Sequence, residues 1–126
     1  MHSTSTPPTH VLLVEDEAFL RELVVENLQD AGYSVVEASD GSAGVDALRS
    51  DRPIDVLLSD IKLPDIDGYE VARIGKKLRP ELKVILMTGY APVPLPPALQ
   101  AQVHCVLRKP FPLSTLPDTV AAAMDS

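Results

Sequence analysis

The sequence is poor in cysteine, in aromatic residues and in positive charge, and these shortages exclude several classes of protein. Its single cysteine, Cys105, cannot form a disulfide within the chain, which excludes a disulfide-stabilised scaffold and favours a reducing compartment. Eleven Lys and Arg against eighteen Asp and Glu give a net charge of −7, which argues against direct nucleic-acid binding because that binding depends on neutralising phosphates. No apolar run approaches the roughly 20 residues that span a bilayer, and the N-terminus lacks the pattern of a signal peptide. We therefore expect a cytoplasmic protein without membrane attachment.

The length and the apolar content fit one globular domain. The chain has 126 residues, of which 45% are hydrophobic, and folding should bury roughly two-thirds of the surface of such a chain. The first nine residues are small, polar and proline-bearing. We therefore predict a disordered leader over residues 1–9 and a folded domain over residues 10–126.

Five short apolar runs recur along the domain and are predicted as strands. They are rich in Leu or β-branched residues and nearly continuous, which is typical of strands that are covered on both faces of a sheet. The runs occupy residues 11–14, 34–38, 54–59, 84–87 and 103–107.

The stretches between these runs carry helical signals. Apolar residues from Phe19 to Leu28 recur at i, i+3 and i+4, and Gly32 follows as a stop. Asp67 is placed to cap a further helix, which Pro80 ends. Alternation of strand and helix predicts an α/β fold with a doubly wound, five-stranded parallel sheet and helices on both faces. Such sheets bind ligands at the carboxyl ends of their strands.

Polar side chains follow the predicted strands at that edge. Glu15 and Asp16 follow the first run, Asp60 the third, Thr88 the fourth and Lys109 the fifth. Neighbouring carboxylates repel unless a cation offsets their charge, and Mg²⁺ takes one or two carboxylates while leaving positions for water or phosphate oxygens. Asp60 can then attack phosphorus as a nucleophile, with Lys109 and Thr88 binding the transferred group. A single strand-end Asp is more often a helix cap, so the prediction depends on the four segments together.

Four stretches, taken in order, resemble the receiver domains of two-component response regulators, the CheY-like family. The resemblance covers nearly the whole chain, from His10 to Met124, and implies the strand order 2-1-3-4-5 that is known for flavodoxin and CheY. The matching stretches are VLLVEDE (11–17), LLSDIKLPDIDGYE (57–70), VILMTGYA (84–91) and VLRKPF (106–111).

The resemblance implies a role for each polar residue at the sheet edge. Asp60 is the phospho-acceptor, Thr88 and Lys109 contact the phosphoryl group, and the bond between Lys109 and Pro110 is expected to be cis. The Mg²⁺ ion has ligands from two segments, namely Glu15 through a bound water, Asp16, Asp60 and the backbone carbonyl of Lys62.

The function implied is that of a phosphorelay receiver. Asp60 takes a phosphoryl group from a phosphohistidine of a sensor histidine kinase or a histidine phosphotransfer protein, and the charge added switches binding of a downstream protein partner. The domain catalyses this transfer to itself and its own dephosphorylation, so it is not an enzyme that acts on a diffusible product. It either stands alone or is the receiver portion of a hybrid histidine kinase.

Two departures from the family concern its usual output face. Prolines between residues 92 and 97 each remove an N–H group and disfavour helix before them, so the fourth helix should begin no earlier than Pro96 and be short. Val106 stands where receivers commonly carry Tyr or Phe. These departures leave an alternative open, a pseudo-receiver-like interaction module that works without phosphorylation. A true phosphatase is disfavoured because no second DxD-type carboxylate or lid domain is present.

Overall fold

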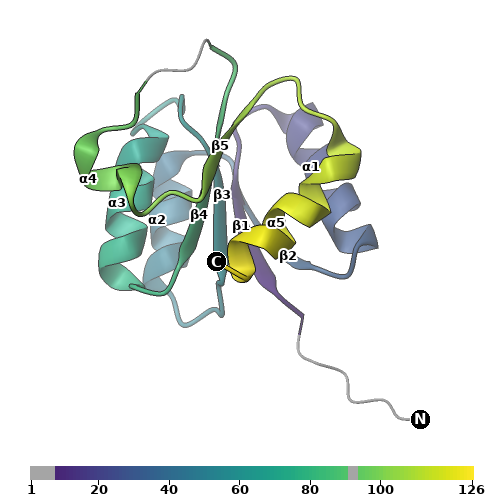
Figure 1. Ribbon diagram of the computed structural model, residues 1–126, viewed down its shortest axis with the longest axis horizontal. Coiled ribbons are helices and arrows are strands. Elements are labelled where there is room, and N and C mark those ends of the chain that lie inside the picture. The colour runs from purple at the N-terminus through teal and green to yellow at the C-terminus, as the bar shows by residue number, and fades with distance from the viewer. Residues whose placement is uncertain (1–7, 91–93) are drawn as a thin grey trace.

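A five-stranded parallel sheet forms the centre of the protein (Figure 1). The structure is a computed structural model, and it describes residues 8–90 and 94–126. The strand order β2-β1-β3-β4-β5 confirms the predicted doubly wound α/β fold. The strands are β1 His10–Val14, β2 Ser34–Ala38, β3 Val56–Asp60, β4 Lys83–Thr88 and β5 Cys105–Arg108.

Helices cover both faces of this sheet. One face carries α1 and α5, and the other carries α2, α3 and α4, as the two groups on either side of the strands in Figure 1 show. The short 3₁₀ helix η1 leads directly into α5. The helices are α1 Ala18–Asp30, α2 Gly41–Arg49, α3 Gly68–Leu78, α4 Pro97–Gln100, η1 Leu113–Thr115 and α5 Leu116–Met124.

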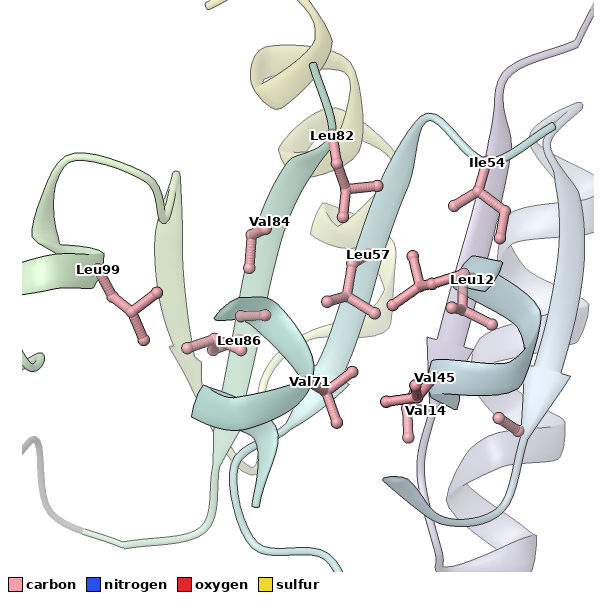
Figure 2. Packing of buried hydrophobic residues seen from close by; sticks show 13 residues of the cluster. Leu12, Val14, Val45, Ile54, Leu57, Val71, Leu82, Val84, Leu86 and Leu99 are labelled. Carbon is pink, nitrogen blue, oxygen red and sulfur yellow. The ribbon is translucent and has the colours of Figure 1, made fainter. Parts of the chain in front are cut away.

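The core consists of two layers, one on each side of the sheet. Successive side chains of a strand point to opposite faces, so Leu12 and Leu57 pack under α2 and α3 (Figure 2), while Leu13 and Leu58 pack against α1 and α5. Every residue of β3 is buried. Burial on both faces explains why the central strands appear in the sequence as continuous apolar runs.

Both edge strands depart from the prediction that all five strands are covered on both faces. In β2 only Ala38 is buried, and the residues of β5 alternate between half-buried and exposed. Val106 is aligned with Leu86 of β4, on the face that carries α4, and it is 37% exposed. An edge strand beside a four-residue helix does not have enough neighbouring chain to cover it.

The predicted buried stripe of α1 is wrong at its N-terminal end. Val24 and Leu28 are fully buried against the sheet, whereas Phe19 is 69% exposed. The first turn of α1 lies beside the loop that follows β5, and Phe19 with Phe111 borders an open hollow there. The periodicity thus identifies the helix correctly but assigns its first apolar residue to the wrong surroundings.

The fourth helix is short, as predicted. It begins at Pro97, whose lack of an N–H group is tolerated at the first helical position, and it ends at Gln100. Residues 94–96 before it have no regular secondary structure. Two predictions fall partly outside the described residues, namely the leader (residues 1–7) and the absence of helix before Pro96 (residues 91–93). Within the described residues, no helix has both the length and the apolar content needed to cross a membrane.

Candidate functional site

The polar residues predicted at the strand ends meet at the carboxyl edge of the sheet. Asp60 and Thr88 are the last residues of β3 and β4, Glu15 follows β1, and Lys109 follows β5. Glu15, Asp60 and Thr88 are buried, although each carries a polar side chain. Buried polar groups require partners, so the contacts of these side chains define what the site can bind.

The ammonium group of Lys109 joins the two buried carboxylates. Its Nζ lies 2.7 Å from Glu15 Oε1 and 2.7 Å from Asp60 Oδ2. Burial raises the pKa of Glu15, and the hydrogen bond from Lys109 offsets this only in part. Burial alone would lower the pKa of Lys109, but its hydrogen bonds to Asp60 and Glu15 outweigh that effect and raise it above the ordinary value. Lys109 is therefore charged at neutral pH and held against Asp60.

A third carboxylate makes this edge suitable for a divalent cation. Glu15, Asp16 and Asp60 each offer a carboxylate oxygen, and these oxygens lie within 4.8 Å of one another. One ammonium group cannot balance three carboxylates. A hard divalent ion such as Mg²⁺ prefers oxygen ligands of this kind, so the donor set fits the predicted cofactor.

The backbone of Lys62 lies beside the same carboxylates. Its N–H donates a hydrogen bond to Asp60 Oδ1 at 3.3 Å. The Lys62 side chain turns outward and donates from Nζ to the hydroxyl of Tyr90 at 2.9 Å. Lys62 and Tyr90 thereby connect the loops after β3 and β4 across a hollow of about 530 Å³, which Asp16, Asp60 and Lys109 also line.

The two remaining predictions about this edge concern Thr88 and Pro110. The Thr88 hydroxyl accepts a hydrogen bond from the backbone N–H of Tyr90 at 3.1 Å, and a hydroxyl that accepts in this way can still donate its own proton. The peptide bond between Lys109 and Pro110 is cis, as expected. All predicted site residues thus lie along one edge of the sheet.

Asp65 is a residue of this region whose contacts the sequence did not predict. Its carboxylate accepts hydrogen bonds from the backbone N–H groups of Gly41 and Ser42 at the start of α2. The predicted cap of α3 is present, since Asp67 Oδ1 accepts from the N–H of Glu70 at 2.9 Å. A cap within three residues has a local sequence signature, whereas a contact across 24 residues has none.

Comparison with known proteins identifies the family that the sequence resemblance implied. The family profile of the response regulator receiver domain matches residues 11–121. The chain is 38% identical over 107 residues to the response regulator receiver protein CpdR of Brucella abortus, which covers 84% of this chain and 88% of that protein. It is 37% identical over 118 residues to the C4-dicarboxylate transport transcriptional regulatory protein DctD of Pseudomonas aeruginosa, covering 93% of this chain but only 25% of the relative.

Solved structures share the whole fold. A CheY-like receiver domain from Methanospirillum hungatei superposes with a TM-score of 0.85 at 28% identity, covering 94% of this chain and 95% of that one. The receiver domain of the hybrid histidine kinase CckA superposes with a TM-score of 0.76 at 30% identity, covering 91% and 98%. From the family profile, these relatives and the residues at the strand ends, it follows that the chain belongs to the response regulator receiver domains.

Proposed function

We propose that this receiver accepts a phosphoryl group on Asp60 from a phosphohistidine, with Mg²⁺ bound at the adjacent carboxylates. The observation that carries the proposal is the buried Asp60, with the Lys109 ammonium 2.7 Å from one of its oxygens. In the transfer an Asp60 carboxylate oxygen attacks phosphorus, the P–N bond breaks, and its electron pair leaves with the imidazole nitrogen. The product is an acyl phosphate on Asp60.

The remaining side chains bind and stabilise the group being transferred. Lys109 neutralises charge on the phosphoryl oxygens, and the Thr88 hydroxyl donates a hydrogen bond to one of them. When bound, Mg²⁺ would neutralise the carboxylates and the incoming phosphoryl oxygens. Its ligands would come from the residues described above, namely Asp16, Asp60, the Lys62 carbonyl and, through water, Glu15.

The surface beside Asp60 suits docking of the phosphohistidine protein. A hollow of about 420 Å³ lies between the first turns of α1 and the segment after β5, and Lys109 lines both it and the hollow over Asp60. Most of its lining is apolar, and Phe19 is 69% exposed at its rim. We propose that a helix of a sensor histidine kinase or a histidine phosphotransfer protein binds in this hollow. Because Lys109 lines both hollows, a donor bound there would place its phosphohistidine close to Asp60.

The phosphorylated domain then acts through a protein partner. A phosphoryl group adds nearly two negative charges at Asp60, competes with the Glu15 and Asp60 carboxylates for the Lys109 ammonium, and accepts a hydrogen bond from the Thr88 hydroxyl. The loops after β3 and β4 carry Lys62 and Tyr90, so these loops transmit the change to the surface. The domain catalyses its own phosphorylation and then the hydrolysis of the acyl phosphate, in which water attacks, inorganic phosphate leaves and the Asp60 carboxylate is restored.

Intact-mass analysis after incubation with acetyl phosphate tests the proposal. The wild-type protein should gain one phosphoryl group only when Mg²⁺ is present, and Asp60→Asn should gain none. Asp60→Asn preserves the size of the side chain, so loss of uptake reports chemistry and not folding. Absence of uptake in the wild type, together with no binding of beryllofluoride, would contradict the proposal.

A second candidate function is supported by the face that carries α4. The four-residue α4 and the exposed Val106 alter the surface on which receivers usually display their phosphorylation state. A domain altered in this way can bind a partner regardless of phosphorylation. The acetyl phosphate experiment separates the two candidates, because only the first requires phosphoryl uptake at Asp60.

A further inference from the structure

The loop that carries Lys62, residues 61–67, is attached to the start of α2 by Asp65. The two carboxylate oxygens of Asp65 accept hydrogen bonds from the N–H groups of Gly41 and Ser42, each at 2.8 Å. Charge-assisted bonds at a helix N-terminus are stronger than neutral ones. Desolvation opposes ionisation here, but the N–H hydrogen bonds outweigh it and lower the pKa of Asp65. The attachment is therefore ionic at neutral pH.

Close packing joins the same loop to α2. A Cβ on Gly41 would overlap the side chain of Ile66 and lie 3.0 Å from the Ile66 carbonyl oxygen. Glycine therefore lets the loop backbone approach the helix more closely than any other residue would. Because the loop and the helix start touch directly, a shift of one displaces the other.

The same helix also contacts the strand that leads to the other half of the acidic cluster. A Cβ on Gly44 would lie 2.8 Å from Val14 Cγ2, and Val14 directly precedes Glu15. The N–H of Glu15 in turn donates to the carbonyl of Ala38, shortly before α2, at 3.0 Å. Helix α2 thus lies between the segment that holds Glu15 and the 61–67 loop, and it contacts both.

We propose that Asp65 is a positioning residue for the cation site, because through α2 it fixes the Lys62 backbone relative to Glu15 and Asp16. Mg²⁺ demands nearly ideal octahedral geometry, so its ligands must be held in place. The ends of the loop are fixed by backbone hydrogen bonds, from the Ile61 N–H to Met87 and from the Gly68 N–H to Ile61. Asp65 fixes the middle of the loop through its hydrogen bonds to the start of α2. This inference rests on the proposed function, since it assigns the support of the same site.

The chain offers a matched control in Asp40. Its carboxylate caps the same helix by accepting from the N–H of Ala43 at 2.8 Å, but this bond stays within α2 and its cap. Asp40→Ala and Asp65→Ala should both lower the melting temperature, because each removes acceptors from the start of α2. Only Asp65→Ala should also release the loop that carries Lys62.

Mn²⁺ binding, followed by the electron paramagnetic resonance signal of the free ion, measures the difference. We expect Asp65→Ala to weaken Mn²⁺ affinity roughly tenfold, at the lower end of the losses caused by removing outer-shell support. Asp40→Ala should stay within about twofold of the wild type. Asp65→Asn keeps one oxygen acceptor and should recover part of the loss. In acetyl phosphate reactions, Asp65→Ala should need correspondingly more Mg²⁺ for its half-maximal rate.

Each other outcome has a defined meaning. Equal affinities of the wild type and Asp65→Ala, or equal losses in Asp65→Ala and Asp40→Ala, would show that Asp65 only stabilises α2 and would overturn the inference. A wild-type protein that binds no Mn²⁺ would overturn it as well. A wild-type protein that binds Mn²⁺ but takes up no phosphoryl group would contradict the proposed function instead, and the affinities would still decide the role of Asp65.

Discussion

Helices α3 and α4 cover the same face of the sheet, yet the chain secures them to very different degrees. Helix α3 has eleven residues, a side-chain cap from Asp67, and Gly75 in close contact with Leu82 and Leu48. Helix α4 has four residues, and its only buried side chain is that of Leu99. Its N-cap is Pro96, for which the described residues show no side-chain cap.

The difference in packing between α3 and α4 corresponds to the parts of the molecule that each helix contacts. The first residue of α3, Gly68, packs against the end of β3, because a Cβ there would overlap the carbonyl oxygen of Asp60. Placement of Asp60 therefore depends directly on α3. Helix α4 leads only to the edge strand β5 and to Val106. Under the proposed function, the helix that packs against Asp60 is held firmly, whereas the helix on the face proposed to bind a partner is held by few contacts.

The largest expected effect tests this difference in packing directly. Leu57, under α3, and Leu99, in α4, are both buried. Leu57→Ala should lower the free energy of unfolding by about 4 kcal/mol, because its surroundings on both sides are fixed and the cavity persists. Leu99→Ala should cost about 2 kcal/mol, since a four-residue helix can collapse into the space. Urea unfolding measures both, and equal losses would show that α4 is held as firmly as α3.

An effect of about tenfold should distinguish the hollow beside Phe19, where we propose that the phosphohistidine protein docks, from the face that carries α4. Phe19→Ser removes the apolar side chain at the rim of the hollow beside Lys109, so it should slow transfer from a histidine kinase that phosphorylates the wild type about tenfold. Its rate with acetyl phosphate should not change. Val106→Ser, an exposed apolar residue on β5, is the control and should affect neither rate. Slowing by Val106→Ser alone would assign donor docking to the opposite side.

A change of a few fold is expected at the contact between the loops after β3 and β4. The Lys62 ammonium and the Tyr90 hydroxyl meet at 2.9 Å across the hollow over Asp60, and we infer that this contact restricts access of water to a phosphorylated Asp60. Lys62→Met should therefore speed dephosphorylation about threefold, or less than 1 kcal/mol in the barrier. Tyr90→Phe removes only the hydroxyl and should have a smaller effect in the same direction. Dephosphorylation rates equal to that of the wild type in both variants would exclude this role.

The smallest effect concerns the pH dependence of the bond between Asp65 and the start of α2. In the part of the chain that the structure describes, helix α4 has no side-chain cap of this kind. The pKa of Asp65 is lowered from its ordinary value of 3.8, so its stabilisation is present above that value and is lost as pH falls through the folded pKa. The wild type should melt at a higher temperature than Asp65→Asn at neutral pH. That difference should shrink in acid, because protonation removes the charge of Asp65. A difference in melting temperature that grows below pH 4 would contradict the predicted direction of the pH dependence.

The sequence correctly predicts the central strands of the sheet, the residues at their ends and the cap of α3. Strands β1, β3 and β4 lie within one or two residues of the apolar runs, because burial on both faces leaves a continuous pattern. Asp60 and Thr88 follow from the ends of these runs, since a parallel sheet brings its carboxyl ends together. The cap of α3 by Asp67 can also be predicted, because it involves residues only three positions apart.

What the sequence does not predict depends on how the segments pack against one another in the fold. The exposure of β5 depends on how little of α4 remains to cover it, and the exposure of Phe19 depends on the segment after β5. The bond from Asp65 to α2 spans 24 residues. Gly75 costs an isolated helix about 1 kcal/mol relative to Ala, and only the folded chain reveals Leu82 and Leu48 against it.

The position of Tyr90 has a practical consequence for spectroscopy. The chain has no Trp and three Tyr, of which Tyr33 donates a hydrogen bond to the carbonyl of Pro117 and Tyr69, in the first turn of α3, packs against the core. Tyr90 is 58% exposed at the mouth of the hollow, with the Lys62 ammonium 5.2 Å from its ring centroid. Any event in the hollow that displaces Lys62 changes the surroundings of this chromophore. We therefore expect intrinsic tyrosine fluorescence to change whenever a group bound at Asp60 displaces Lys62, which would give a label-free optical readout.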